Sequence, residues 1–228
     1  MTLVTTLSAV TGLAAEKHRS RVDGPAARAL SFFENDSASL DPRFLGRLRP
    51  APLSPALRAQ VLTSLPADGE LSPTRTEGAQ LAALEPIFRL HDRSGMIAIK
   101  VIDVGHAFVG LHARTVLLLS RDALALVTPE ELQALAAHEL GHEYLWNDYQ
   151  AAMASKAHAR IQELELVCDG IAVMSLAALG VDPAHLGGAV SKMTRYNERR
   201  GATASADAYV SLGERLSFID AMVARLAP

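Results

Sequence analysis

Two histidines four residues apart, His138 and His142, stand near the middle of the chain in the stretch HELGH, with Glu139 directly after the first. On a helix, side chains at positions i and i+4 lie above one another on one face, so the two imidazoles can bind one metal ion together. A glutamate beside the first histidine supplies the general base that metal-dependent hydrolysis needs. The spacing therefore predicts a metal site with hydrolytic chemistry.

The motif alone does not decide the function. A sequence with 8 histidines in 228 residues contains an HExxH by chance with odds of roughly one to two per cent. The alternative is an ordinary polar surface helix. The surroundings of the motif argue against this alternative. Thr128, Pro129 and Glu131 are typical of a capped helix start, so both histidines lie on a well-defined predicted helix. Gly141 costs such a helix about 1 kcal/mol relative to alanine, which indicates that another segment approaches its backbone closely.

A catalytic zinc takes three protein ligands and leaves a fourth position for water, so a third ligand must come from another element. The next predicted helix, over about 155–178, contains Glu165 and Asp169, which are again four residues apart and share a face. One of these carboxylates can bind the metal while the other holds the second nitrogen of a histidine. His158 lies on the same face and stays an alternative ligand. Cys168 is predicted to pack rather than to bind.

The stretches ELQALAAHELGHEYL and ELELVCDGIAVMSLAALGVDP together resemble metallopeptidase family 48 of the gluzincins. That family includes the CAAX prenyl proteases, the HtpX membrane proteases and soluble periplasmic quality-control proteases. Its pattern is HExxH, then E-x-x-A-D downstream, then an apolar helix that ends near G-x-D-P. Cys168 stands where the family usually has alanine, and the resemblance covers about residues 80–220.

The resemblance implies a role for each motif residue. His138, His142 and Glu165 would hold one Zn²⁺ per chain, which agrees with the ligand chemistry of zinc. Glu139 would be the general base, and Asp169 would orient one of the zinc histidines.

The upstream stretch VGHAFVGLHARTVLLLSRDAL resembles the edge strand of that family and its neighbour, with His106 in place of the usual asparagine. The resemblance implies that a polypeptide substrate binds there as an added strand, because main-chain pairing presents its carbonyl to the metal. The residues expected to form this edge are His106, Ala107, Phe108, Val109 and Gly110.

The downstream stretch AYVSLGERLSFI resembles a degraded H-P-x-x-x-E-R-I pattern, with Tyr209 where the histidine would stand. A phenol donates a hydrogen bond at neutral pH, so Tyr209 is a candidate for stabilising the oxyanion. The alternative is that Tyr209 packs as a hydrophobe at the start of a helix. Arg215 and Tyr196 are then the next candidates.

The elements that must position these residues predict an α+β fold. Strands are expected in GMIAIKVID and ARTVLLLS, with an extended segment between them, and helices follow. We expect a mostly helical, gluzincin-like domain over residues 76–228, with a small sheet whose edge strand lines the cleft. The leucine- and proline-rich residues 1–75 are expected to form a helical extension packed on that domain.

The composition of the chain limits the kinds of partner that we expect it to bind. A net charge of −3 and a pI near 6.2 argue against a nucleic-acid-binding surface. No apolar run reaches the roughly 20 residues of a membrane helix, and the longest is GIAVMSLAALGV. The single cysteine excludes an intrachain disulfide but leaves the compartment open. The oligomeric state is not predicted.

Together these features predict a zinc-dependent endopeptidase that cleaves extended polypeptides. The rival interpretation is a catalytically silent gluzincin scaffold that binds a metal or a partner, supported by the departures at His106 and Tyr209. A zinc hydrolase that acts on another kind of substrate is a third, weaker interpretation. A prenylated substrate is not expected, because the membrane chamber of that branch is absent.

Overall fold

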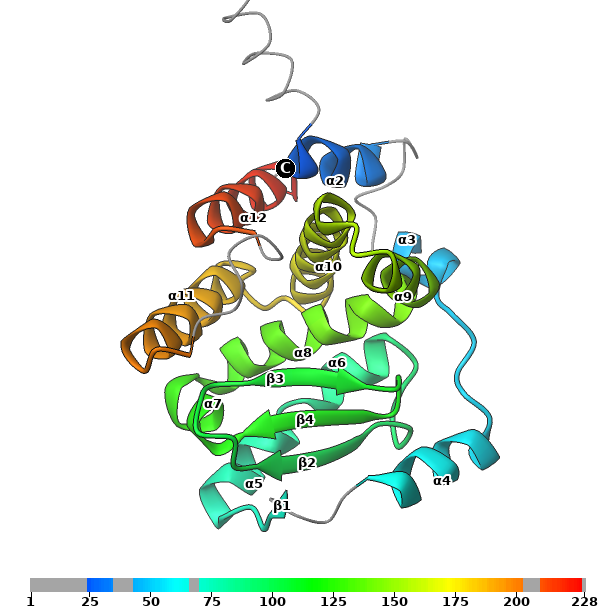
Figure 1. The fold of residues 1–228 in the computed structure, drawn as a ribbon, viewed down its shortest axis with the longest axis vertical. Coiled ribbons are helices and arrows are strands. Elements are labelled where there is room, and N and C mark those ends of the chain that lie inside the picture. Colours follow the sequence, from blue (N-terminus) through cyan, green and yellow to red (C-terminus); the bar gives the residue numbers. More distant parts are fainter. Residues whose placement is uncertain (1–23, 35–42, 66–69, 203–209, 227–228) are drawn as a thin grey trace, which may run out of the picture.

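The computed structural model describes residues 24–34, 43–65, 70–202 and 210–226 (Figure 1). A mixed sheet lies at one end of the molecule and helices form the rest. The sheet has the order β1-β2-β4-β3. Its strands are β1 Glu70–Leu71, β2 Ala98–Ile102, β3 Val109–His112 and β4 Val116–Ser120. β2 and β4 are parallel, whereas β1–β2 and β3–β4 are antiparallel. The predicted α+β class is confirmed.

Helices account for most of the described chain. They are α2 Pro25–Glu34, α3 Arg43–Leu48, α4 Pro55–Ser64, α5 Arg75–Ala82, α6 Glu85–Leu90, α7 Arg121–Leu126, α8 Pro129–Tyr144, α9 Trp146–Ala154, α10 His158–Ala178, α11 Ala184–Arg199 and α12 Leu212–Leu226. None of the described helices is long and apolar enough to cross a membrane. α5 and α6 are separate helices, and Pro86 lies in the first turn of α6, where a proline is tolerated. α7 and α9 were not expected from the sequence.

α8 and α10 form the centre of the molecule. α8 begins at the expected capping box, in which Thr128 and Glu131 cap each other's backbone N–H groups. α10 is buried along most of its length and packs against α8, α9, α11, α12 and α2. A Cβ atom at Gly141 would lie 3.0 Å from Cα and Cβ of Cys168. The glycine therefore lets α10 approach α8 closely, as the sequence indicated.

The described part of residues 1–75 belongs to the same hydrophobic core. α2 packs against α10 and α12, at the end of the molecule opposite the sheet (Figure 1). Phe33 of α2 is buried against Gly170 of α10, where a Cβ atom would lie 2.4 Å from the Phe33 ring. β1 extends the sheet beside β2. The boundary between residues 75 and 76 stays a prediction.

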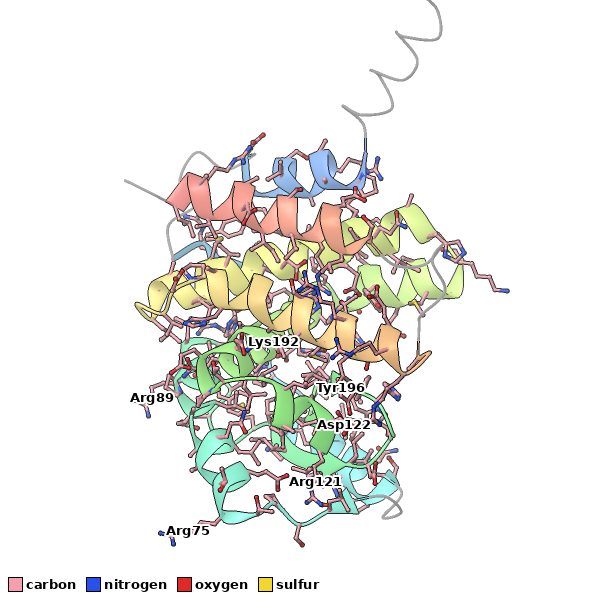
Figure 2. All side chains as sticks on the ribbon, turned by 90° about the vertical axis from the view of Figure 1, so that its left-hand side faces the viewer. Arg75, Arg89, Arg121, Asp122, Lys192 and Tyr196 are labelled. Carbon is pink, nitrogen blue, oxygen red and sulfur yellow. The ribbon has the colours of Figure 1, made fainter. Side chains whose placement is uncertain are left out.

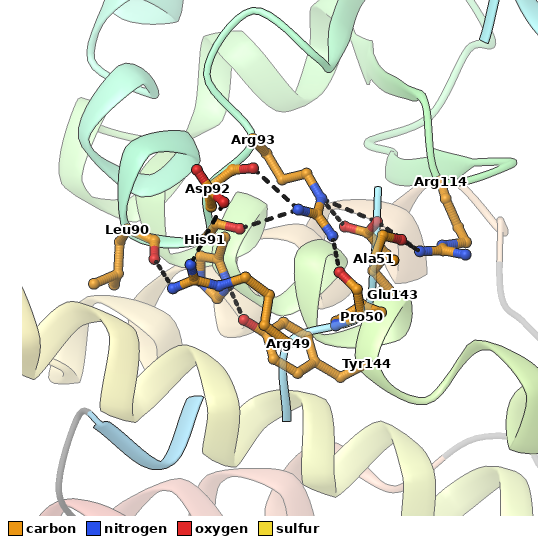
Figure 3. Close-up of polar contacts among 10 residues, drawn as sticks. All are labelled: Arg49, Pro50, Ala51, Leu90, His91, Asp92, Arg93, Arg114, Glu143 and Tyr144. Carbon is orange, nitrogen blue, oxygen red and sulfur yellow. Dashed lines mark hydrogen bonds and ion pairs between the residues drawn. The ribbon is translucent and has the colours of Figure 1, made fainter. Parts of the chain in front are cut away.

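The segment between α3 and α4 is tied to the end of α8 by a buried polar cluster (Figure 3). Arg93 and Glu143 form a buried ion pair, with Nε donating to both carboxylate oxygens at 3.0 and 2.8 Å. Arg93 also donates to the carbonyl of Pro50 at 2.6 Å. Nη2 of Arg114 donates a hydrogen bond to Oε1 of Glu143 at 3.1 Å. The same atom donates to the carbonyl of Ala51 at 2.6 Å. Glu143 follows His142 directly, so this cluster anchors the last turn of the motif helix.

Candidate metal centre

The two motif histidines and Glu165 meet between α8 and α10. Nε2 of His138 lies 3.4 Å from Oε2 of Glu165, and Nε2 of His142 lies 3.7 Å from Oε1 of the same carboxylate. The two imidazole rings stand edge to face, with centroids 5.1 Å apart. One carboxylate therefore faces the Nε2 atoms of both histidines, which is the arrangement that a shared cation requires.

Glu139 lies at the same centre but makes a different contact. It offers a ligand atom within 4.8 Å of those of His138 and His142. Its Oε2 accepts a hydrogen bond from the backbone N–H of Leu111 in β3 at 2.9 Å. That bond fixes the carboxylate between the histidines and the edge of the sheet. Proximity alone does not separate the two glutamates, but their partners do, since Glu165 faces both imidazoles and Glu139 faces the strand.

Asp169 is hydrogen-bonded to the first motif histidine. It is fully buried, and its Oδ1 lies 2.8 Å from Nδ1 of His138. Arg215 of α12 donates two hydrogen bonds to the same carboxylate, each 2.7 Å long. Burial alone would raise the pKa of Asp169, but Arg215 and His138 outweigh it and lower that pKa. The carboxylate only accepts, so Nδ1 of His138 carries a hydrogen, and Nε2 is the atom that binds a metal once it has released its own proton.

The charges at the centre favour a cation. Burial and Arg215 oppose protonation of His138, yet Asp169 and Glu165 prevail and raise the pKa of His138 to about 9. Burial would also raise the pKa of Glu165, but the hydrogen bond from His138 and the charge of His142 hold it well below its usual range. A proton shared here occupies the place that a metal takes when it binds and releases that proton.

Tyr149 belongs to the centre and was missed by the sequence analysis. Its hydroxyl donates to Oε1 of Glu165 at 2.9 Å, and its ring centroid lies 4.7 Å from that of His142. Among the described residues, Nδ1 of His142 is buried without a hydrogen-bond partner. The second histidine is therefore positioned by the Tyr149 ring and by packing. Nothing in the spacing indicated Tyr149, because α9 starts a new direction after Leu145.

The residues present fit a zinc ion. Two imidazoles and one carboxylate converge at a buried point, with a second carboxylate beside it, which is the donor set of catalytic zinc sites. His158 is exposed at the start of α10, whereas Glu165 is buried and faces both imidazoles, so His158 is not supported as a ligand. Cys168 is buried and packs against Gly141.

The edge strand is displaced from the predicted residues 106–110. β3 covers Val109–His112, so only Val109 and Gly110 of the predicted set lie in it. His106, Ala107 and Phe108 precede the strand. Their main-chain groups are partly occupied, because Phe108 is bonded to Ser120 and Ala107 to Asn197. Asn197 is 90 positions from Ala107 in the sequence, so its bonds leave no signal in the stretch in which the resemblance placed the edge.

The candidates for stabilising an oxyanion have different outcomes. Tyr209 lies outside the described residues. Arg215 lies at the centre, but its guanidinium is engaged by Asp169. Tyr196 lies on α11 beside Asp122 of α7 (Figure 2), with the Arg200 guanidinium 4.6 Å from its ring centroid. The structure therefore gives no support to Tyr196 or Arg215 in that role.

Comparison with known proteins adds no family. The sequence matches no protein-family model and no curated protein. The resemblance to the gluzincins thus rests on the motif residues, and the functional argument rests on the geometry of the centre.

Proposed function

We propose that the protein is a zinc-dependent endopeptidase that cleaves extended or unfolded polypeptides. The observation that carries the proposal is the convergence of His138, His142 and Glu165 beside the outer edge of β3. A metal held by these residues would lie within reach of the main-chain groups to which a peptide can pair. The gluzincin fold is proposed on the same ground.

The residues of the centre divide the work of peptide hydrolysis. Bound zinc would activate a water molecule and polarise the substrate carbonyl. Glu139 takes the proton of the attacking water and delivers it to the leaving amine. Its bond to the N–H of Leu111 aims the carboxylate toward the bound peptide. Asp169 and Arg215 fix the tautomer and orientation of His138.

The substrate would pair with the outward-facing main chain of β3. Leu111 directs its N–H away from β4, toward Glu139. In an antiparallel pair alternate residues face alternate sides, so the N–H and C=O groups of Val109 face outward as well. A peptide added along this edge brings its carbonyl past Glu139 and the histidines.

One observation favours the silent scaffold. The N–H of Leu111, which an added strand would use, is occupied by the proposed general base. In a scaffold without turnover this bond would be permanent, and the centre would bind metal or a partner without cleaving it. In an enzyme the substrate or its water displaces one carboxylate oxygen.

The experiment compares the zinc-loaded protein with its Glu139→Gln variant on unfolded casein. The glutamine retains an oxygen for Leu111 but cannot accept a proton. We expect one zinc per chain in both proteins, and turnover in the variant reduced about 10²-fold or more. Equal activity in the two proteins refutes the mechanism. Stoichiometric zinc without cleavage of casein or of extended peptides by the parent favours the scaffold.

A further inference from the structure

The side chain of Asn197 makes the hydrogen bonds of a paired strand to Ala107, just before β3 begins. Its Nδ2 donates to the carbonyl of Ala107 at 2.9 Å, and its Oδ1 accepts from the N–H of Ala107 at 2.9 Å. These are the two main-chain bonds that a neighbouring strand makes to one residue. The side chain that makes them comes from α11, 90 positions away in the sequence.

Asn197 and Glu139 act on the same side of this chain segment. The Phe108 carbonyl accepts from Ser120 N at 2.8 Å, and its N–H donates to Ser120 Oγ at 2.8 Å, so Phe108 faces β4. Ala107 and Leu111 have the opposite orientation and face outward. The outward side therefore carries Asn197 at Ala107 and Glu139 at Leu111, with Val109 between them.

The last turn of α11 is held in place around Asn197. Arg200 donates to the carbonyl of Gly105 at 3.2 Å and lies 3.6 Å from Asp122 of α7. Both contacts fix the end of the helix to the segment that leads into β3. Asn197 is therefore a built part of the edge rather than a side chain that swings freely.

We propose that Asn197 ends the substrate-binding edge and limits how far a substrate extends beyond the scissile bond on its carboxyl side. The inference rests on the proposed peptidase function. Antiparallel pairing is the more stable arrangement, and it directs the carboxyl side of a bound peptide from Leu111 toward Ala107. At about 3.4 Å per residue, this distance accepts about three residues after the bond that faces Glu139.

The inference narrows the substrate class to polypeptides cut near their carboxyl ends. A chain with more residues on that side meets Asn197 and has to leave the edge, which gives up main-chain hydrogen bonds. On its amino side the substrate passes His112 and meets no comparable side chain among the residues for which the structure gives contacts. The protein then prefers bonds near the carboxyl end of an extended polypeptide, which it still cleaves within the chain, as the proposed endopeptidase does.

The test uses peptides of one core sequence with two to eight residues after the cleaved bond. For the zinc-loaded parent we expect KM to rise about tenfold once that segment exceeds about three residues, because roughly two hydrogen bonds are lost. Asn197→Ala should remove this length dependence. Asn197→Ser serves as a second variant if the alanine protein folds poorly. Glu198→Ala, an exposed neighbour on α11, is the matched control and should retain the parent profile.

Peptide binding separates this inference from the proposed function. Fluorescence anisotropy with zinc-loaded Glu139→Gln protein measures affinity without turnover, with and without Asn197→Ala. A parent that cleaves nothing refutes the peptidase, whereas the length dependence of binding still supports or overturns the role of Asn197. Equal affinity of the Glu139→Gln protein for peptides with short and long carboxyl segments overturns the inference. So does a length dependence that Asn197→Ala leaves unchanged, or an absence of peptide binding by both proteins.

Discussion

Gly141→Ala tests whether the crossing of α8 and α10 sets the geometry of the metal centre. The new Cβ would lie 3.0 Å from both Cα and Cβ of Cys168, and 3.3 Å from its Sγ. Backbone of a buried helix cannot rotate away, so α10 has to shift by a few tenths of an ångström. Glu165 is carried on α10 and the two histidines on α8, so the shift changes the spacing of the proposed ligands.

Two opposing effects determine how much Gly141→Ala changes the free energy of unfolding. Replacing a helical glycine by alanine contributes about 1 kcal/mol of helix propensity. Overpacking of a tight contact costs about 1–3 kcal/mol. Gly78→Ala in α5 separates the two effects, because a Cβ there meets nothing within 4 Å. We expect Gly78→Ala to be stabilised by about 1 kcal/mol and Gly141→Ala to be less stable than Gly78→Ala by about 1–3 kcal/mol.

The assay is thermal denaturation of both variants, combined with zinc affinity measured by competition with a chelator. A difference of 1–3 kcal/mol corresponds to a few degrees or more in Tm for a chain of this size, roughly 2–4 °C for each kcal/mol. Zinc affinity should fall about tenfold in Gly141→Ala and stay unchanged in Gly78→Ala, since ligand distances tolerate only about 0.2 Å. If Gly141→Ala gains as much stability as Gly78→Ala and retains full zinc affinity, the helix crossing does not set the site.

Three further predictions concern single side chains. Glu165→Ala should lose most of its zinc in elemental analysis, because two histidines alone hold a catalytic zinc poorly; full occupancy would show that the third ligand is elsewhere. Tyr149→Phe removes the hydrogen bond to Glu165 and should weaken zinc binding by about 10–100-fold in a chelator competition, as loss of such outer partners does; unchanged affinity would make Tyr149 a packing residue only. Burial, with Arg49 and Arg93 nearby, lowers the pKa of His91 from 6.5 to about 3. As the pH falls, His91 is protonated first in the unfolded chain. The contribution of neutral His91 to the free energy of unfolding is therefore fully present above pH 6.5, and the free energy of unfolding falls by roughly 3–5 kcal/mol as the pH drops toward 3. His91→Gln should flatten the urea midpoint across that range, and an equally steep loss in the variant would assign the acid sensitivity to other groups.

The parts of the centre that follow helix periodicity were predictable from sequence. His138 and His142 share a face because they are four apart, and Glu165 and Asp169 do so for the same reason. The glycine in the motif indicated a close neighbour, and the structure identifies it as α10. These predictions needed only the regular geometry of a helix.

The remaining parts depend on contacts that no local pattern encodes. Tyr149 reaches Glu165 because α8 ends at Tyr144 and a separate helix, α9, packs against α10. The edge strand begins later than expected because Asn197 occupies Ala107 from a distant helix. Side-chain bonds of this kind replace strand pairing without leaving a signature in the alternation of apolar residues.

The packing of α2 on α10 has a consequence for the synthesis of the chain. α2 leaves the ribosome early, yet its partner α10 begins more than 120 residues later. At about 5–20 residues per second, the apolar face around Phe33 waits on the order of ten seconds for its binding surface. Arg215, which holds Asp169, is translated later than every other described residue of the centre. A nascent chain therefore carries the motif helix without the partners that orient its side chains until translation has passed α12.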